Sequence, residues 1–365
     1  MAINYIEMRL EDCMDAIIDY RGKTPKKVDN GIPLITAKII KNGRIQEVSE
    51  FIAIDDYDNW MVRGLPLEGD VVLTTEAPLG EVAQLDARKV ALAQRVITLR
   101  GKKGTLENDY LLYLLQSSFV QNQLDGRASR STVTGIKQSE LREIILRLPP
   151  TALQKSISHQ LKCLDKKIDL NNKINQTLEQ MSQTLFKSWF VDFDPVIDNA
   201  LDAGTPIPEA LQSRAELRQK VRNSADFKPL SADIRALFPA EFEETELGWV
   251  PKGWQTKSMH DLVESVSITF PLSKTDKVIF LNTGDIETGS FLHQNYSKTE
   301  GLPGQAKKSI KKGDILFSEI RPENKRYAFV HFESDDYVVS TKLMVLRAKN
   351  EINPLLPYFI ITLED

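Results

Sequence analysis

The longest regular pattern of apolar residues lies in the middle of the chain, directly after Pro149-Pro150. From Leu153 to Trp189 apolar side chains recur at steps of three and four, and neither Gly nor Pro occurs between 151 and 194. Such spacing over about five heptads is typical of a coiled-coil helix. We therefore predict a helix of roughly 58 Å, at about 1.5 Å per residue. Its partner-binding seam would consist of Ile157, Leu161, Leu164, Ile168, Leu178, Met181 and Leu185.

Aromatic residues gather at the end of this predicted helix. Phe186, Trp189, Phe190 and Phe193 share one helix face, because their spacing is i, i+3, i+4 and i+7. Two interpretations are open: the face docks a partner protein, or it is a hydrophobic cap that packs under the second of the two repeated modules described next. The second is the more ordinary one for such a cluster, but Phe186, Trp189 and Phe190 are retained as candidate partner contacts.

Short apolar segments separated by turn residues flank the helix, and they occur twice. Gly69-Asp70 is followed by VVLTT, and Gly313-Asp314 is followed by ILFSE. The offset from Asp70 to Asp314 is 244, and the strand ending at Leu99 matches the strand ending at Leu346 at an offset of 247. An interval of this length indicates a duplicated domain rather than a solenoid repeat.

These elements predict an α+β fold: two duplicated α/β domains joined by the long coiled-coil helix. The domains are expected at 1–149 and 249–365, the helix at 150–194, and an acidic linker with short helices at 195–248. In the first domain we predict a helix and four strands, at Asn108–Leu124 and at Pro33–Ile40, Asp70–Thr75, Val96–Arg100 and Leu141–Leu148. At the same offset, position 365 aligns with about position 119. We therefore expect the second domain to be incomplete and a second long helix to be absent.

The composition narrows the function classes. No run of 18 apolar residues and no secretion signal occur, so we expect a cytoplasmic protein without a membrane partner. Cys13 and Cys163 are too few for a disulfide framework, and the four histidines lack metal-ligand spacing, so no metal site is predicted. No phosphate-binding loop, methyltransferase motif or dinucleotide loop is present, so we expect no catalytic residues and no cofactor in this chain.

The net charge of −4 by itself argues against binding to nucleic acid, but the charges are distributed unevenly along the chain. Residues 20–44 hold seven Lys or Arg and one acid, and residues 307–326 hold seven Lys or Arg and three acids. Residues 191–250, in contrast, hold twelve acids and six bases. Basic patches within the repeated domains favour contact with phosphate, because local charge sets the electrostatic footprint for nucleic acid. Ordinary solubilising surface is the alternative for each cluster alone.

Several segments of the chain resemble one protein family. They are the RGKTP start (Arg21–Pro25), the PPTALQKSISHQLKCLDKKI segment (Pro149–Ile168), the FKSWFVDFDPV end of the helix and the ELGWVPKGW entry to the second domain (Glu246–Trp254). Together they resemble the specificity subunit of type I restriction-modification systems. The resemblance implies that two target-recognition domains read the halves of a split double-stranded DNA sequence. It also implies two methyltransferase (modification) subunits, which carry S-adenosylmethionine, as partners, with restriction subunits as further ones.

Candidate DNA contacts were chosen from basic and hydrogen-bonding residues in both domains. Arg suits guanine and Asn suits adenine, whereas Lys and Arg on phosphate position the protein without reading sequence. The candidates are Arg21, Lys23, Thr24, Lys26, Lys27, Lys38, Lys41, Arg127, Arg130, Ser131, Thr132, Thr134 and Lys137 in the first domain, and Lys274, Lys277, Asn282, Thr283, Arg321, Asn324, Lys325 and Arg326 in the second. Glu76 and Glu319 lie in equivalent loops and suit either cytosine or turn capping.

Two other functions remain open at this stage. One is a nuclease with an unrecognised site. The other is a scaffold or decoy that dimerises through its long helix, or sequesters methyltransferase subunits without reading DNA. An unpaired seam favours self-association through the 151–190 helix, because exposed apolar stripes find partners.

Overall fold

The computed structural model describes residues 5–22, 24–129 and 134–363. It divides into two compact units, residues 1–173 and 174–365, and the division falls inside the long helix. Helices and strands are mixed in both units, and one 40-residue helix runs through the boundary, which confirms the predicted α+β class. The domain limits given above stay predictions.

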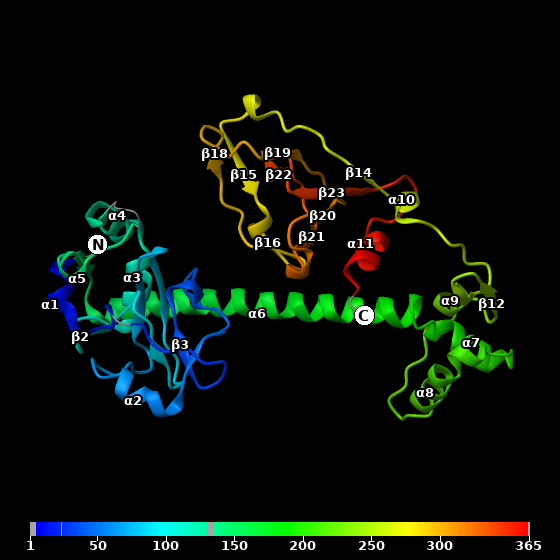
Figure 1. The fold of residues 1–365 in the computed structure, drawn as a ribbon, viewed down its shortest axis with the longest axis horizontal. Coiled ribbons are helices and arrows are strands. Elements are labelled where there is room, and N and C mark those ends of the chain that lie inside the picture. The colour runs from blue at the N-terminus through cyan, green and yellow to red at the C-terminus, as the bar shows by residue number, and fades with distance from the viewer. Residues whose placement is uncertain (1–4, 23, 130–133, 364–365) are drawn as a thin grey trace. The chain divides into compact units, whose positions relative to one another are not determined.

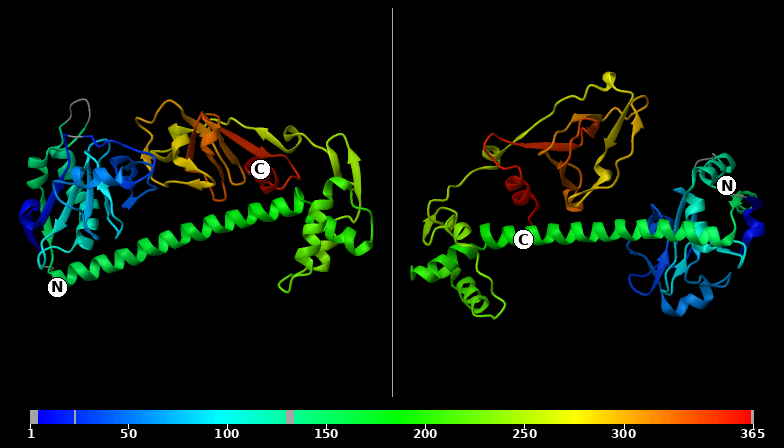
Figure 2. Two further views of the ribbon diagram at one scale, coloured as in Figure 1. Left: turned by 60° about the horizontal axis from the view of Figure 1, so that its bottom comes forward. Right: turned by 180° about the vertical axis from the view of Figure 1, so that it is seen from behind.

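The long helix, α6, spans Thr151–Phe190 without interruption (Figures 1 and 2). It ends four residues before the predicted limit of 194. Phe193 adopts a left-handed backbone (φ 57°), and Pro195 lies in the first turn of the next helix, α7 (Asp194–Ala203). Because proline lacks an amide hydrogen and fixes φ, it fits the start of a helix and not the interior.

The first module, before α6, is built on an antiparallel main sheet and smaller sheets, one of which pairs β3 in parallel with β9. Its main sheet has the order β2-β10-β7-β8, and β1 pairs with β11 at the module's ends in sequence. The strands are β1 (Ile6–Arg9), β2 (Met14–Asp19), β3 (Ile32–Ile35), β4 (Ile40–Lys41), β5 (Arg44–Ile45), β6 (Phe51–Ile52), β7 (Val71–Thr75), β8 (Leu79–Gln84), β9 (Ala91–Leu92), β10 (Val96–Gly101) and β11 (Ile145–Leu148). The helices are α1 (Leu10–Cys13), α2 (Tyr57–Trp60), α3 (Asn108–Gln116), α4 (Ser118–Arg127) and α5 (Gln138–Arg142).

The predicted helix over 108–124 is two helices, which corrects the sequence interpretation. Ser117 has an extended backbone (φ −67°, ψ 147°) and its side chain accepts from the Val120 amide, so it ends α3 and caps α4. Serine is a preferred N-cap because its oxygen satisfies a free amide of the first turn. The predicted strand over 33–40 is also shorter, because residues 37–39 form a 3₁₀ turn.

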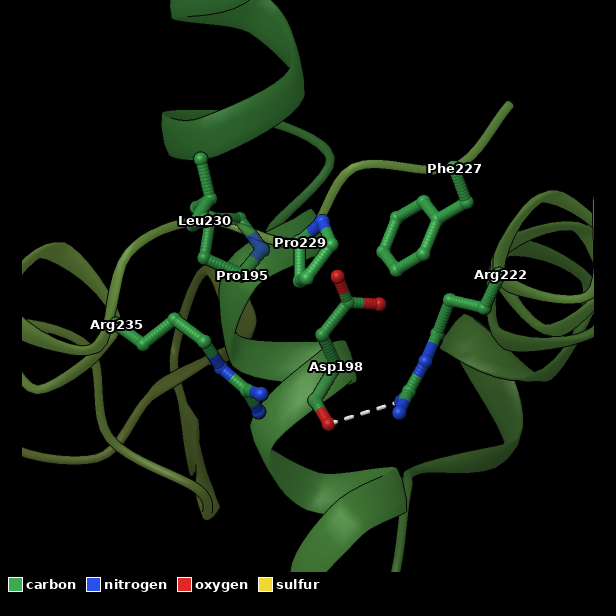
Figure 3. A pocket seen from close by; sticks show the side chains of 7 residues that line it. All are labelled: Pro195, Asp198, Arg222, Phe227, Pro229, Leu230 and Arg235. Carbon is green, nitrogen blue, oxygen red and sulfur yellow. Dashed lines mark hydrogen bonds between the residues drawn. The ribbon is translucent and has the colours of Figure 1, made fainter. Parts of the chain in front are cut away.

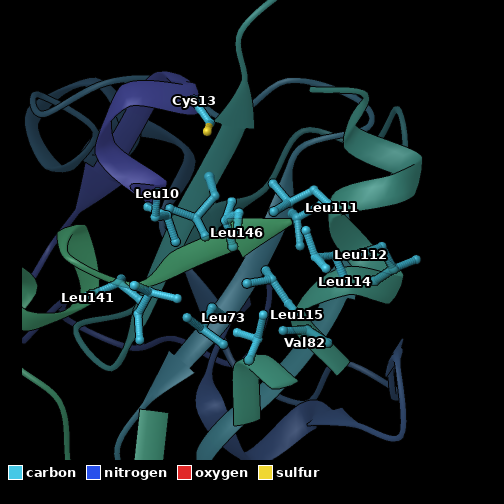
Figure 4. Packing of buried hydrophobic residues seen from close by; sticks show 14 of the residues in the cluster. Leu10, Cys13, Leu73, Val82, Leu111, Leu112, Leu114, Leu115, Leu141 and Leu146 are labelled. Carbon is cyan, nitrogen blue, oxygen red and sulfur yellow. The ribbon is translucent and has the colours of Figure 1, made fainter. Parts of the chain in front are cut away.

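Two apolar clusters fill the first module. One lies between the main sheet and α3, where Leu111 and Leu115 are fully buried against Leu73 and Leu146 (Figure 4). The other lies on the opposite side of the sheet and includes Leu34, Ile52 and Leu92. With both faces covered, β7 is buried at all five of its positions.

The second module repeats this architecture within its own unit. Its main sheet has the order β14-β23-β20-β21, matching β2-β10-β7-β8, and β15 pairs in parallel with β22 as β3 does with β9. The strands of the unit are β12 (Phe242–Thr245), β13 (Gly248–Pro251), β14 (Val263–Ser265), β15 (Lys277–Leu281), β16 (Ile286–Glu287), β17 (Ser290–Phe291), β18 (Ser297–Lys298), β19 (Ala306–Ser309), β20 (Ile315–Ser318), β21 (Tyr327–Phe329), β22 (Tyr337–Ser340) and β23 (Leu343–Ala348). Beside α7, its helices are α8 (Gln212–Arg222), α9 (Ala232–Arg235), α10 (Met259–Leu262) and α11 (Leu355–Thr362).

The Gly-Asp turn that marks the repeat has the same structural use in both modules. Asp70 is buried, accepts from the Leu67 amide at 2.8 Å and pairs with Arg100 at 2.8 Å. Asp314 is buried, accepts from the Lys311 amide at 2.8 Å and pairs with Arg347 at 2.8 Å. A buried carboxylate needs such partners, since leaving it unpaired is costly. The sequence repeat is therefore a repeat of structure.

Candidate nucleic-acid interface

Arg21, the first candidate DNA contact, is half-buried and binds acceptors of the first module itself. Its guanidinium donates two hydrogen bonds to Asp19, at 2.7 and 2.8 Å, and a third to the Ile136 carbonyl at 2.8 Å. Arg63 in turn donates to the Asp19 and Arg21 carbonyls, at 3.0 and 2.8 Å. The guanidinium of Arg21 is thus occupied by the protein's own acceptors.

The other candidates of the basic segment are more accessible. Lys26 and Lys41 are exposed, and no hydrogen bond or ion pair joins either side chain to another described residue. Lys27 and Lys38 flank Glu50 at 2.8 and 3.8 Å, and Lys38 remains 80% exposed. The Thr24 hydroxyl donates to Gln94 at 2.7 Å. Surface ion pairs of this kind are weak, so these lysines stay available to phosphate.

Arg44, which also belongs to the basic segment 20–44, forms ion pairs with the long helix. It pairs with Asp169 at 2.7 Å and with Asp165 at 3.5 Å, both on α6. The N-terminal half of α6 is attached to the module by further contacts, from Tyr113 to Asp165 at 2.6 Å and from Lys162 to Asp109 at 2.6 Å. Sequence reasoning missed these attachments, because nothing in the spacing of Arg44 and Asp169 links them.

Burial and hydrogen bonds pull the pKa of Asp109 in opposite directions. Burial raises it, but hydrogen bonds from Lys162 and Gln84, with the Lys162 charge, outweigh burial and lower it. The Tyr113 pKa is raised, first by burial and then by its hydrogen bond to Asp165. Both shifts belong to the junction between α3 and α6.

The loop after α4 carries the remaining first-module candidates. Arg127 pairs with Glu140 at 3.2 Å, and Thr134 and Lys137 are exposed. The flanks of the loop meet in an antiparallel bridge between Ser129 and Gly135, and Gly135 also bridges to Glu76. The candidates Lys23, Arg130, Ser131 and Thr132 lie outside the described residues.

In the second module, one group of candidates flanks β15, with Lys274 and Lys277 at its start and Asn282 and Thr283 after its end. Lys274 is exposed, and the Lys277 ammonium lies 4.6 Å from the ring centre of Tyr296. Asn282 caps the 3₁₀ turn at Thr283–Asp285, since its side chain accepts from the Thr283 amide at 2.8 Å. Asn282 and Thr283 are only half-buried, but the Asn282 oxygen is committed to the turn.

The other group lies on the hairpin between β20 and β21. Arg321, Asn324 and Lys325 are exposed, and Arg326 is half-buried. Arg321 and Lys325 both have left-handed backbones, at φ 52° and 49°, on either side of a 3₁₀ turn. Ala77, at the tip of the β7–β8 hairpin, has the same left-handed backbone before a proline. The tips are equivalent, but the second is longer and presents more cations.

The acidic residues of these hairpins differ in their surroundings. Glu76 pairs with Arg95 at 2.8 Å, which leaves its carboxylate already engaged. Glu319 is exposed, and its amide donates to the Lys342 carbonyl at 3.2 Å. An ion pair within the protein is a second structural role for Glu76, beside the turn capping expected from the sequence.

The predicted seam of α6 divides into a covered and an exposed part. Ile157 packs against the first-module core and Leu161 is half-buried. The other five seam residues are exposed, and with two further apolar residues of the helix, Leu170 and Ile174, they form a stripe of residues that are 46–62% exposed: Leu164, Ile168, Leu170, Ile174, Leu178, Met181 and Leu185. We call these residues the α6 stripe.

The aromatic end of α6 packs largely within its own unit. Phe186 is buried and stacks on Phe359 of α11 at 5.3 Å. Trp189 meets Phe238 at 5.7 Å, and Phe190 meets Trp254 at 6.0 Å. This is the second of the two interpretations above. It leaves Trp189 and Phe190 partly exposed, and their contact with a partner stays a prediction.

The acidic segment after α6 contains a helical subdomain in which the aspartates of α7 are paired with arginines. Asp194, Asp198 and Asp202 on α7 meet Arg214, Arg218 and Arg222 on α8. A cavity of about 40 Å³ lies beside this ladder, lined by Asp198, Arg222, Phe227 and Arg235 among others (Figure 3). Arg222 donates to the Asp198 carbonyl and Arg235 to Asn199, so both guanidinium groups are occupied. The repeated offset of 20 between acid and base was the signal available in the sequence.

None of the described helices combines the length and the apolar composition that a bilayer span requires. Across the described ranges, no three His, Cys, Asp or Glu side chains converge as metal ligands would.

The comparisons with known proteins agree on one family. The sequence model described as "Type I restriction modification DNA specificity domain" matches residues 4–180 and 251–365. The chain is 48% identical over 110 residues to the type I restriction enzyme HindI specificity subunit of Haemophilus influenzae, covering 30% of this chain and 24% of that protein. It is 31% identical over 128 residues to the MjaIX specificity subunit of Methanocaldococcus jannaschii, covering 35% and 29%. The matches thus span about a quarter of each curated relative.

Among solved structures, a type I restriction-modification S subunit from M. genitalium aligns with a TM-score of 0.44 and 13% identity, over 98% of this chain and 76% of that one. The HsdS subunit from Thermoanaerobacter tengcongensis aligns with a TM-score of 0.36 and 14% identity, over 97% and 78%.

Proposed function

Because the chain belongs to the family of type I restriction modification DNA specificity domains, we propose that it is the DNA-reading, non-catalytic subunit of a type I restriction-modification complex. Each module binds one half of a split double-stranded target. The chain also recruits two modification subunits, which carry S-adenosylmethionine and perform methylation, and restriction subunits join the same assembly.

The observation that carries this proposal is the match of one DNA-specificity family model to both halves of the chain, on modules of the same topology. Two similar modules suit a target with two separate parts. Exposed Lys26, Lys41 and Lys274 provide charge for phosphates, which positions a protein on DNA. Arg321 and Asn324 on the second hairpin tip provide groups that distinguish bases.

The test is co-expression with a modification subunit of the same system, followed by co-purification and mapping of methylated bases in the cellular DNA. The modification subunit expressed alone is the control. A split motif supports the proposal, and a complex that methylates nothing contradicts it. Incubation of the purified chain with supercoiled DNA and Mg²⁺ tests the non-catalytic assignment, because nicking would reveal a nuclease.

The α6 stripe supports a second candidate function, a scaffold that pairs through this helix. Its side chains are about half exposed along a row of seven apolar residues. Exposed apolar rows on helices are typical protein contact surfaces. A second copy of the chain, or a modification subunit, would cover it. A palindromic methylation motif built from one half-site would favour paired chains, and a complex without methylation would favour a decoy.

A further inference from the structure

We infer that Arg21 is a positioning residue for DNA reading by the first module, and not a phosphate contact. It fastens the C-terminal flank of the loop after α4 to the end of β2. This inference rests on the proposed function, because it assigns a role within the same DNA-reading surface.

The hydrogen bonds of Arg21 connect two segments far apart in sequence. Two of its donors reach Asp19 at the end of β2, and the third reaches the Ile136 carbonyl, 115 positions away, at 2.8 Å. Asp19 also accepts from the Arg21 amide at 2.9 Å, which fixes the turn between them. A guanidinium with this planar set of bonds has few donors left for DNA.

The same flank is held from a second side by β7. The Ile136 amide donates to the Thr75 carbonyl at 3.0 Å, and Gly135 bridges to Glu76. The approach is close: a Cβ added at Gly135 would lie 3.1 Å from both the Thr75 oxygen and the Glu76 Cβ. Ile136 itself is buried. Arg21 on one side and β7 on the other therefore fix where the flank leaves the module.

This attachment matters for reading because candidate contacts lie directly beside it. Thr134 and Lys137 are exposed on either side of Gly135–Ile136. A reading group must be held close to its productive geometry by the residues that support it. Loosening the flank would spread the positions of Thr134 and Lys137, which reduces discrimination between sequences more than it reduces attraction to phosphate.

Substitution of Asp19 tests the inference, because the two possible roles of Arg21 predict opposite effects on DNA binding. If Arg21 contacted phosphate, removing the Asp19 carboxylate would free a cation and strengthen binding to every duplex. If Arg21 is a positioning residue, Asp19→Asn and Arg21→Lys both loosen the flank. Arg21→Lys keeps the charge but cannot reproduce the three bonds to Asp19 and Ile136.

The experiment uses the full chain in complex with its modification subunits and two duplexes of equal length. One carries the target found by methylation mapping, and the other has that sequence scrambled. We expect Arg21→Lys and Asp19→Asn each to lower the ratio of the two affinities by roughly tenfold, the scale of one lost base contact. The salt dependence of binding to the scrambled duplex should not change. Lys26→Gln, the matched control, should weaken binding to both duplexes alike.

Hydrogen exchange of the free chain supplies a readout that needs no DNA. The Gly135 and Ile136 amides should exchange faster in Arg21→Lys and in Asp19→Asn, with an unchanged unfolding temperature for the first module.

Unchanged exchange would overturn the inference. So would a fall of about 0.9 in the salt slope for Arg21→Gln, the value for one phosphate, or tighter binding of Asp19→Asn to both duplexes. If Arg21→Lys does not fold, Asp19→Asn alone decides. A wild-type complex that does not distinguish the duplexes refutes the proposed function, while the exchange result still decides the attachment.

Discussion

Tyr113 on α3 donates a 2.6 Å hydrogen bond to the Asp165 carboxylate on α6. It joins the first module to the helix that follows it, together with the pairs that Arg44 and Lys162 make. The module is therefore attached to α6 mainly by polar groups placed around Ile157 and the apolar core beneath it.

Tyr113→Phe should weaken this attachment by about 1 kcal/mol, the usual net value of one hydrogen bond, or somewhat more because the acceptor is charged. The measurement is hydrogen exchange of α3 and of residues 151–170 in the full chain. Tyr5→Phe, on an exposed tyrosine in the same module, serves as the control. Equal exchange in Tyr113→Phe and wild type would show that the hydroxyl contributes nothing.

The Asp109–Lys162 contact should make the same junction sensitive to acid. The folded-state pKa of Asp109 is lowered from its ordinary value of 3.8. Its contribution to stability is therefore complete above about pH 4 to 5 and is lost as the pH falls through the folded-state pKa. Asp109→Asn should flatten the stability of the first module between pH 5 and pH 3, relative to wild type. Thermal unfolding across this pH range measures it, and an identical profile for both proteins would contradict the assignment.

The duplicated buried ion pairs predict two separable losses of stability. Asp70→Asn and Asp314→Asn each remove the charge of a buried carboxylate from its partly buried arginine partner, which costs up to about 3 kcal/mol. Each change should loosen its own module and leave the other intact. Limited proteolysis with mapping of the cut sites tests this. Cleavage in the first module of Asp314→Asn would be the wrong result.

The α6 stripe predicts association through the helix. Leu178→Glu should weaken self-association or binding of a modification subunit by tenfold or more, because it places a charge in an apolar contact. Gln180→Glu, which adds the same charge at an exposed position off the stripe, should have little effect. Sedimentation at micromolar concentration compares them. A strictly monomeric wild type that also binds no modification subunit would refute a partner role for the stripe.

We expect Asn324, on the second hairpin tip, to affect base-specific recognition, and Lys274 to affect binding to DNA of any sequence. Asn324→Ala should cost about 1–3 kcal/mol on one base pair and relax that position. Lys274→Ala should weaken binding to every sequence and lower the salt slope by about 0.9. Binding titrations on single-substituted duplexes at several salt concentrations separate the two effects.

The repeats and the long helix could be predicted because their signals are local. The Gly-Asp turns and the apolar spacing from Leu153 onward gave the duplicated modules and α6. The break at Ser117 was missed, because apolar spacing continues across it and only the N-cap reveals it.

The candidate DNA contacts could be predicted only in part, because a sequence does not show which Lys and Arg side chains form ion pairs within the protein. Lys26 and Lys41 are exposed as a phosphate contact requires. Arg21 and Arg44 carry the same charge but bind Asp19, Asp165 and Asp169. These pairings depend on the fold bringing distant segments together, as with Arg21 and Ile136, which composition and spacing do not encode.

The row of Asp–Arg ion pairs between α7 and α8 is compatible with more than one alignment of the two helices. All three Asp–Arg pairs share one offset and repeat every helical turn, so a slip by one turn would exchange the three pairs for two new ones of the same kind. Arg218 already approaches Asp194, its neighbour in the shifted arrangement, at 3.9 Å. Charge alone therefore selects the alignment weakly. Other contacts hold α7 but do not reach α8: Asn199 donates to the Arg235 and Phe238 carbonyls, and Ser188 donates to Asp194. In this subdomain the amide and the hydroxyl fix the place of α7, and the register of α8 against it depends on arginine contacts, including the hydrogen bond from Arg222 to the Asp198 carbonyl.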